Sequence, residues 1–228
     1  MDTQEKKQLR EEIKKKTRLL GLPPVPELTI QMEVKLGDEV LHDHQEEAHS
    51  WTRNGWNIMT AQMFQIQPCL SGDFGVGAFG LTKTNGDIQS VDADLITQGN
   101  RCLSAAANSG DGVVVGTSGA VFNTEHYQLQ GLISHGVIAG TLSYVTMTIA
   151  APAYTVGTKT WKASIKRIFN NLSGGTITVA EVGLVSNNNG LSTFLTARDV
   201  LAEAVDVIDN AQLTVTYGVS MDFSDIDS

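Results

Sequence analysis

The sequence is poor in charge, in cysteine and in long apolar runs. Only 18% of its 228 residues are charged, and two are cysteines. No run of about eighteen apolar residues occurs, so we expect no membrane span. Residues 1–20 lack the apolar stretch of a secretory signal, so we expect a protein made in a cytoplasm. Two thiols in a chain of this size are more often reduced than paired, which leaves the state of Cys69 and Cys102 open.

Positive charge is scarce outside the first twenty residues. The net charge is −9, yet residues 1–20 carry seven Lys or Arg against four Asp or Glu. The remaining chain carries nine basic and 21 acidic residues. An acidic body argues against nucleic acid as a partner, because phosphate contacts need a basic face. The basic start can still meet an acidic protein surface, although a solvated helix end is the plainer interpretation.

The second half of the chain consists of strand-like segments separated by turn formers. Each segment shows period-two alternation or a β-branched run. The segments are YVTMTIA (144–150), WKASIKRIF (161–169), TITVAEVGLV (176–185), TFLTARDVL (193–201) and AQLTVTYGV (211–219). Short strands at this spacing predict a mainly β fold, an antiparallel β-sandwich of the jelly-roll kind.

Residues 1–27 predict a helical arm followed by a stiff connector. Residues 4–20 are rich in Lys and Glu and carry only a thin apolar stripe, so the helix would be marginal alone. The Pro-rich stretch that follows favours an extended stalk. We expect this arm to dock on a neighbouring protein. Its partner-binding residues would be Leu9, Ile13, Leu19, Leu20, Pro23, Pro24 and Pro26.

Residues 28–228 predict one β-sandwich domain with a single crossing helix. TIQMEVKL (29–36) alternates like a half-buried strand, and a second strand covers 39–45. Ser50 can cap a helix that runs to about Gln65 and lies across one face or end of the sandwich. In that helix, Gly55 would permit close approach to another backbone. Residues 70–112 predict an irregular excursion with at most one hairpin, and such long loops usually bind or interlock with something.

Three histidines lie close together beside acidic residues. His42 and His44 would project to the same face of a strand, which could place two imidazoles on one metal ion. The neighbouring candidates are Asp43, Glu46, Glu47 and His49. No spacing signature completes a ligand set. We therefore interpret these side chains as exposed polar residues at a strand end, and we expect no metal and no cofactor.

Other patterns of catalytic residues are incomplete. GVGAFG (75–80) spells a dinucleotide fingerprint, but a turn follows it and the chain lacks βαβ units. Asp92, Asp94 and Asp111 could act as paired carboxylates of a glycosidase, yet they lie where Asp is a common turn former. The lone histidines, which no Gly-x-Ser-x-Gly elbow accompanies, are His126 and His135. We therefore expect no enzymatic activity.

Several charged residues occur inside otherwise apolar or Thr-rich strands. Long charged side chains in a sheet usually pair across strands. A partly buried Arg–Glu pair sets strand register more than it adds stability. We expect Glu181 to face Arg198 or Arg167 as a structural ion pair, and Asp199 lies in the same setting.

The chain resembles a group of tailed-phage and prophage virion proteins over roughly residues 46–219. The motifs that carry the resemblance are EEAHSWTRNGWNIM (46–59), GVVVGTSG (112–119), EHYQLQGLISHG (125–136), GTLSY (140–144), IKRIFNNLSGGTITVAEVGLV (165–185), FLTARDVL (194–201) and QLTVTYGV (212–219). The resemblance implies a β-sandwich building block of a virus particle, made in the host cytoplasm, with no catalytic residues.

Together these observations predict a non-enzymatic virion component, a decoration, neck or tail protein. It would form a homo-oligomer and bind other virion proteins through residues 1–27 and the loops of 70–112, without nucleic acid or membrane. The alternative is a carbohydrate- or receptor-binding sandwich at a tail or fibre tip. The aromatic residues that could stack on sugar rings are Trp51, Trp56, Trp161, Tyr127 and Tyr154. Trp51 and Trp56 fall on the predicted helix, so we expect them in the core instead.

Overall fold

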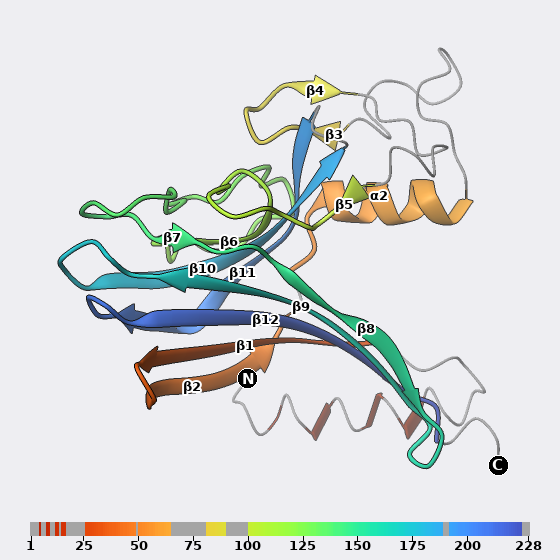
Figure 1. Cartoon of the computed structure of the whole chain (residues 1–228). Coiled ribbons are helices and arrows are strands. Elements are labelled where there is room, and N and C mark those ends of the chain that lie inside the picture. Colours follow the sequence, from red (N-terminus) through yellow and green to blue (C-terminus); the bar gives the residue numbers. More distant parts are fainter. Residues whose placement is uncertain are drawn as a thin grey trace.

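The computed structural model shows a mainly β protein with antiparallel sheets and one helix packed on them (Figure 1). It describes residues 26–48, 50–64, 81–89, 100–188 and 192–224. Seven residues near the start are also described, namely Glu5, Gln8, Leu9, Glu12, Ile13, Lys15 and Lys16. Within these residues the strands form sheets of six, four and two strands. The mainly β prediction is confirmed.

The larger sheet has the order β2-β1-β12-β9, with β7 and β8 both pairing with the far side of β9. Its strands are β1 (Glu27–Leu36), β2 (Glu39–Glu47), β7 (Ser143–Tyr144), β8 (Thr148–Thr155), β9 (Thr160–Asn170) and β12 (Gln212–Asp222). All of these pairings are antiparallel. The first and last strands of the described body are therefore neighbours, and β2 and β8 form the two edges.

The smaller sheet is built around β10, which pairs with β11 on one side and with β5 and β6 on the other. Its strands are β5 (Asn100–Arg101), β6 (Gly112–Gly116), β10 (Ile177–Asn188) and β11 (Ser192–Val207). A separate hairpin joins β3 (Leu81–Thr82) to β4 (Ile88–Gln89). This hairpin and residues 100–112 are the described parts of the excursion that the sequence predicts at 70–112.

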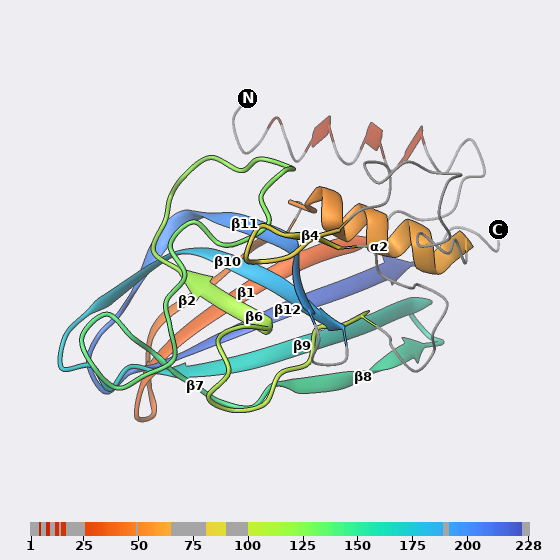
Figure 2. The same cartoon turned by 90° about the horizontal axis from the view of Figure 1, so that it is seen from above.

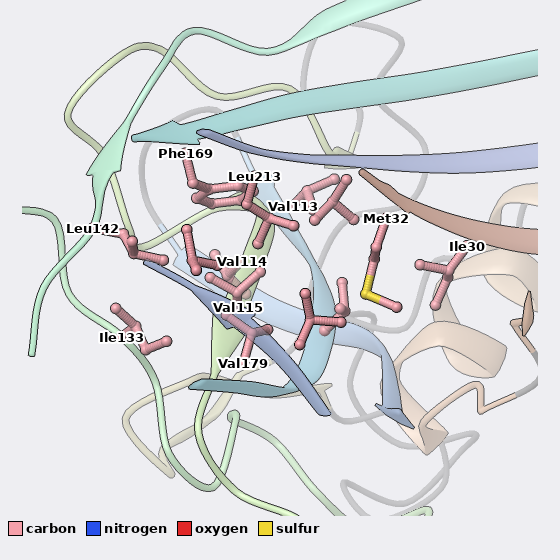
Figure 3. Close-up of a cluster of buried hydrophobic side chains, with 14 of the residues drawn as sticks. Ile30, Met32, Val113, Val114, Val115, Ile133, Leu142, Phe169, Val179 and Leu213 are labelled. Atoms are coloured by element: carbon pink, nitrogen blue, oxygen red, sulfur yellow. The ribbon is translucent and has the colours of Figure 1, made fainter. Parts of the chain in front are cut away.

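One buried cluster fills the space between the two larger sheets (Figure 3). Ile30, Met32 and Val34 alternate along β1 and are completely buried, as their period-two spacing predicts. They meet residues 113–115 of β6, which are buried in an unbroken run. The two sheets thus share one core in a β-sandwich-like arrangement.

The helix, α2 (Arg53–Phe64), packs beside β11 at one end of the two sheets (Figures 1 and 2). Its cap is Thr52 rather than the predicted Ser50, because the Thr52 hydroxyl accepts the Gly55 amide at 3.3 Å. The same hydroxyl donates to the Leu195 carbonyl at 2.6 Å and so ties the helix start to β11. The helix therefore begins later than the sequence predicts.

Two further local predictions need correction. Trp51 precedes α2 and forms an isolated bridge with Ala197, whereas Trp56 is 57% exposed on the helix and not in the core. A single capped helical turn is what the residue types of 123–127 (NTEHY) would otherwise predict. The structure has a simple turn there, in which the Asn123 side chain accepts the Glu125 amide.

Most of the predicted arm lies outside the described residues. Backbone described between Glu5 and Lys16 is helical, and Glu12 pairs with Lys16 at 2.9 Å. Leu9 and Ile13 are 45% and 49% exposed, and Pro26 precedes β1. The remaining partner-binding candidates, Leu19, Leu20, Pro23 and Pro24, lie outside the described residues, as do Cys69, Asp92, Asp94 and the motif at 75–80. The arm stays a prediction.

Among the helices that the structure describes, none is long and apolar enough to cross a bilayer.

We expect Gly55→Ala to destabilise the protein, because a Cβ atom there would lie 2.3 Å from the Thr196 carbonyl oxygen. Overpacking of this kind costs about 1–3 kcal/mol. Alanine in a helix gains up to about 1 kcal/mol over glycine, so a net loss in urea unfolding would show that close packing dominates. Gly119→Ala is the matched control, since its Cβ would meet nothing within 4 Å. Equal stability of both variants would contradict the tight seat of α2 on β11.

Candidate functional site

The guanidinium of Arg167, on the inner face of β9, is a completely buried charge. It donates six hydrogen bonds of 2.6–3.2 Å, all to neutral oxygens. The acceptors are the carbonyls of Ala105, Asn108, Asp111, Val113 and Val145 and the hydroxyl of Ser104. Arg167 thereby fastens the segment 104–113 to the larger sheet. Its hydrogen bond to the Val145 carbonyl also holds the short connection between β7 and β8 against β9.

Aromatic rings complete the surroundings of Arg167. Its Cζ lies 4.7 Å from the ring centre of Tyr144 and 6.0 Å from that of Phe169. Cation–π attraction strengthens as the charge is desolvated. Burial lowers the pKa of Arg167, while Tyr144 and Asp111 act in the opposite direction. The guanidinium stays protonated, because arginine titrates far above neutral pH.

A second buried charge cluster joins Glu181 on β10 to Arg198 on β11. Both side chains are completely buried, and Arg198 Nε lies 2.6 Å from Glu181 Oε2. Glu181 Oε1 accepts the Gly131 amide at 2.6 Å, and Arg198 donates to the Ala120 carbonyl at 2.9 Å. The pair therefore holds two points, Ala120 and Gly131, of the long segment that follows β6. Gly116 leaves the necessary space, since a Cβ there would lie 2.4 Å from Glu181 Oε1.

Of the two partners that the sequence leaves open for Glu181, the structure selects Arg198. Arg167 belongs to the other sheet and binds backbone oxygens instead. His126 completes the cluster, because its Nδ1 accepts the Asn123 amide and contacts Arg198 Nη1, each at 3.2 Å. That geometry places the ring proton on Nε2.

Burial, and then the charge of Arg198, lower the pKa of His126. Its imidazole is therefore neutral in the folded protein near neutral pH. A histidine whose native pKa is depressed supports the fold above its unfolded pKa of about 6.5. That support is lost as the pH falls below this value.

Asp199 forms a third buried polar group, next to Arg198 on β11. It is 2% exposed, and it accepts the Ser50 amide and the Tyr217 hydroxyl, each at 3.2 Å. Burial and the Asp199 charge raise the pKa of Tyr217 well above its usual value. Asp199 therefore links the segment before α2 to the larger sheet.

Asp199 and Tyr217 also lie at the base of an apolar groove of about 180 Å³. The residues that line the groove come from both sheets. In Figure 1 the strands β8 and β9 curve away from the smaller sheet. Its apolar walls include Leu28, Trp51, Ile149, Ile165 and Val219. A concave apolar surface of this kind can receive a small ligand or an apolar side chain of another protein.

The edge strand beside the groove, β8, is exposed at every position. Residues 143–158 contain no charged side chain, and Ile149 and Tyr154 are 57% and 51% exposed. The opposite edge, β2, carries four acidic residues and neither Lys nor Arg in its nine positions. Charged side chains keep edge strands apart, so only the β2 edge is protected in this way.

Pro152 limits how β8 can pair with another strand. It lies where the register between β8 and β9 shifts, between Ala150 and Ala153, and it has no backbone N–H. A contact at this edge would therefore depend on apolar side chains more than on a continuous ladder of hydrogen bonds.

The candidate catalytic residues that the structure describes hold loops in place. Asp111 is 3% exposed and accepts the side-chain amides of Asn108, at 2.8 Å, and of Asn187. His135 Nδ1 accepts the Tyr144 amide at 3.1 Å. Cys102 carries a free thiol whose pKa burial raises to about 12, which makes it a poor nucleophile at neutral pH.

The histidines of β2 are not the exposed residues that the sequence suggests. His42 and His44 are both partly buried, and their ring centres are 6.0 Å apart. Among the described residues, no group of three or more His, Cys, Asp or Glu side chains is arranged to hold a metal ion.

Two of the aromatic candidates come together on the β8–β9 hairpin. Tyr154 and Trp161 are register partners there, and Phe223 lies 6.3 Å from the Tyr154 ring. Trp51 lines the groove instead, and Trp56 is exposed on α2. The Tyr127 ring lies beside Gly86 of the β3–β4 hairpin.

Comparisons with protein-family models, with curated proteins and with solved structures give no match.

Sequence reasoning missed the groove and its polar base. Asp199 and Tyr217 are eighteen residues apart and meet only because β11 and β12 belong to facing sheets. One signal was available, namely the uncharged run at 143–158 in a chain of net charge −9. This run contains the exposed strand β8, which carries no charge that would repel another copy of the acidic chain.

We expect Arg167→Met to destabilise the protein strongly, because it leaves the buried carbonyls around residues 104–113 without donors. Each buried acceptor left without its donor costs about 1–3 kcal/mol, and the sum is measurable by urea unfolding. Lys166→Met is the control, since Lys166 is exposed on the same strand. An Arg167 variant as stable as the control would show that the hydrogen bonds to segment 104–113 contribute little.

We expect Glu181→Gln to lower stability as well, because it removes the charge that compensates Arg198 and disturbs the acceptor of the Gly131 amide. Hydrogen bonds to charged groups contribute about 1.5–3 kcal/mol each. A double-mutant cycle with Arg198→Met measures the coupling directly. Additive effects of the two changes would refute a coupled pair.

Proposed function

We propose that this chain is a non-enzymatic structural component of a tailed-phage particle that assembles with itself and with other virion proteins. Within that class it would be a decoration, neck or tail protein. The motifs that resemble phage virion proteins support the assignment to a phage particle. The surface chemistry of the described residues supports a role in assembly.

The observation that carries the proposal is the uncharged β8 edge, which is exposed at every position and lies next to the apolar groove. Copies of a chain with net charge −9 repel one another wherever their acidic surfaces meet. The β8 edge removes that repulsion and offers Ile149 and Tyr154 for burial. The acidic β2 edge favours separation, so association through β8 would have a defined direction.

The buried charges support a scaffold role. The hydrogen bonds of Arg167 and of the Glu181–Arg198 pair fix two long loop segments. Loops held in this way present a constant surface to a neighbour, which limits the ordering cost of assembly. A particle protein benefits from such rigidity.

The finer parts of the fold prediction belong to this proposal. A jelly-roll-like sandwich is supported by the core that the two sheets share and by the pairing of β1 with β12. The helical, basic arm of residues 1–27 would dock on acidic surfaces of neighbouring copies. The exposed Leu9 and the helical backbone around it agree with an amphipathic arm.

A carbohydrate- or receptor-binding role is the second candidate. It is favoured by Tyr154 and Trp161, which are cross-strand partners on one hairpin. Aromatic side chains at such positions can stack on sugar rings. A glycan array on which Trp161→Ala loses a strong signal would promote this role over assembly.

We expect the purified full-length chain to form a discrete oligomer in light scattering. Ile149→Glu should shift it toward smaller species, because a charge would be buried at the β8 contact. Val40→Glu is the matched control, since Val40 is 50% exposed on the opposite edge of the same sheet. A monomeric wild-type chain would contradict self-assembly. The virion part is tested by fractionating particles, and absence of the chain from purified heads and tails would refute it.

A further inference from the structure

His42, His44 and Glu46 occupy alternate positions of β2 and therefore lie on one face of that strand. Their register partners on β1 are the fully buried core residues Val34, Met32 and Ile30. The face that carries the two histidines and the glutamate is consequently the inner face of the larger sheet. It lies at the open margin of the two layers, opposite β11.

At one point along this margin, Glu46 connects the two sheets. Its Oε2 accepts the backbone amide of Ala202 on β11 at 3.1 Å, so the carboxylate bridges the two sheets. The same oxygen lies 3.5 Å from His44 Nε2. A negative charge is thus fixed beside an imidazole nitrogen at the seam between β2 and β11.

The imidazoles of His42 and His44 have an unusual feature. Both Nε2 atoms are buried and make no hydrogen bond, and the 3.5 Å contact of His44 with Glu46 is too long for one. The rings are tilted by 48° with their centres 6.0 Å apart. Buried polar atoms are nearly always hydrogen-bonded, so two neighbouring exceptions call for an explanation such as a bound ion.

A divalent transition-metal ion would account for the two unpartnered Nε2 atoms, for the closeness of the two rings and for the carboxylate beside them. The Nε2 atom of a neutral imidazole has a lone pair that suits Zn²⁺, Ni²⁺ and Cu²⁺. Histidines two positions apart on a strand share one face, so modest side-chain rotation brings both nitrogens onto one ion. The fixed Glu46 carboxylate supplies opposite charge beside it.

We propose that His42 and His44 chelate one divalent transition-metal ion at the seam between β2 and β11, with Glu46 as the neighbouring carboxylate. Water completes the coordination, since the protein supplies two imidazoles. The ion would hold the β2 edge against β11 and stiffen the acidic margin of the sandwich. This site is independent of the proposed role in a particle.

The test is a calorimetric titration of the untagged full-length chain with Ni²⁺ at pH 7.5. We expect saturable binding of one ion per chain and a higher melting temperature with the metal, because ligand bound to the folded state stabilises it. His42→Gln and His44→Gln should each weaken binding at least tenfold.

Two controls separate this site from general attraction to an acidic protein. His126→Gln should leave Ni²⁺ binding unchanged, because His126 belongs to the Arg198 cluster. Excess Mg²⁺ should not compete, since it prefers oxygen ligands. Absent saturable binding, competition by Mg²⁺, or binding that survives loss of both β2 histidines would overturn the proposal. If a glutamine variant fails to fold, broadening of the His42 and His44 ring signals by Ni²⁺ in the NMR spectrum of the wild type decides instead.

Discussion

A guanidinium inside a hydrophobic core is tolerated only when each of its N–H groups finds an acceptor, and Arg167 meets this constraint with backbone oxygens. The acceptors come from the segment 104–113 and from Val145, all remote from β9 in sequence. Those loops must therefore be in place before the charge can be buried, and the buried charge in turn keeps them in place. The edge of the larger sheet and the start of β6 depend on this mutual requirement.

In the smaller sheet, the Glu181–Arg198 pair likewise combines a buried charge with hydrogen bonds to loop backbone. Each member also binds backbone of the segment between Ala120 and Gly131, so the pair is a loop anchor as well as an ion pair. An ion pair replaced by apolar residues can be just as stable, so stability alone does not explain its presence. Its specific consequence is a fixed loop surface on the outer side of the smaller sheet.

The two edges of the larger sheet have opposite chemistry, and this contrast connects the fold to assembly. The β2 edge is acidic, whereas β8 is uncharged and borders the groove that has Asp199 and Tyr217 at its base. Pro152 prevents β8 from acting as an unrestricted template, which limits uncontrolled strand pairing. A surface that is apolar yet geometrically restricted suits a contact with one defined neighbour.

The strands of this protein were predictable from sequence because alternation is local, as in Ile30, Met32 and Val34. Charged residues within strands likewise narrowed the partner of Glu181 to two arginines. The choice of Arg198, the burial of His42 and His44 and the meeting of Asp199 with Tyr217 were decided only by tertiary structure. Alternation shows that two faces of a strand differ, but which sheet covers a face depends on contacts between residues far apart in the chain.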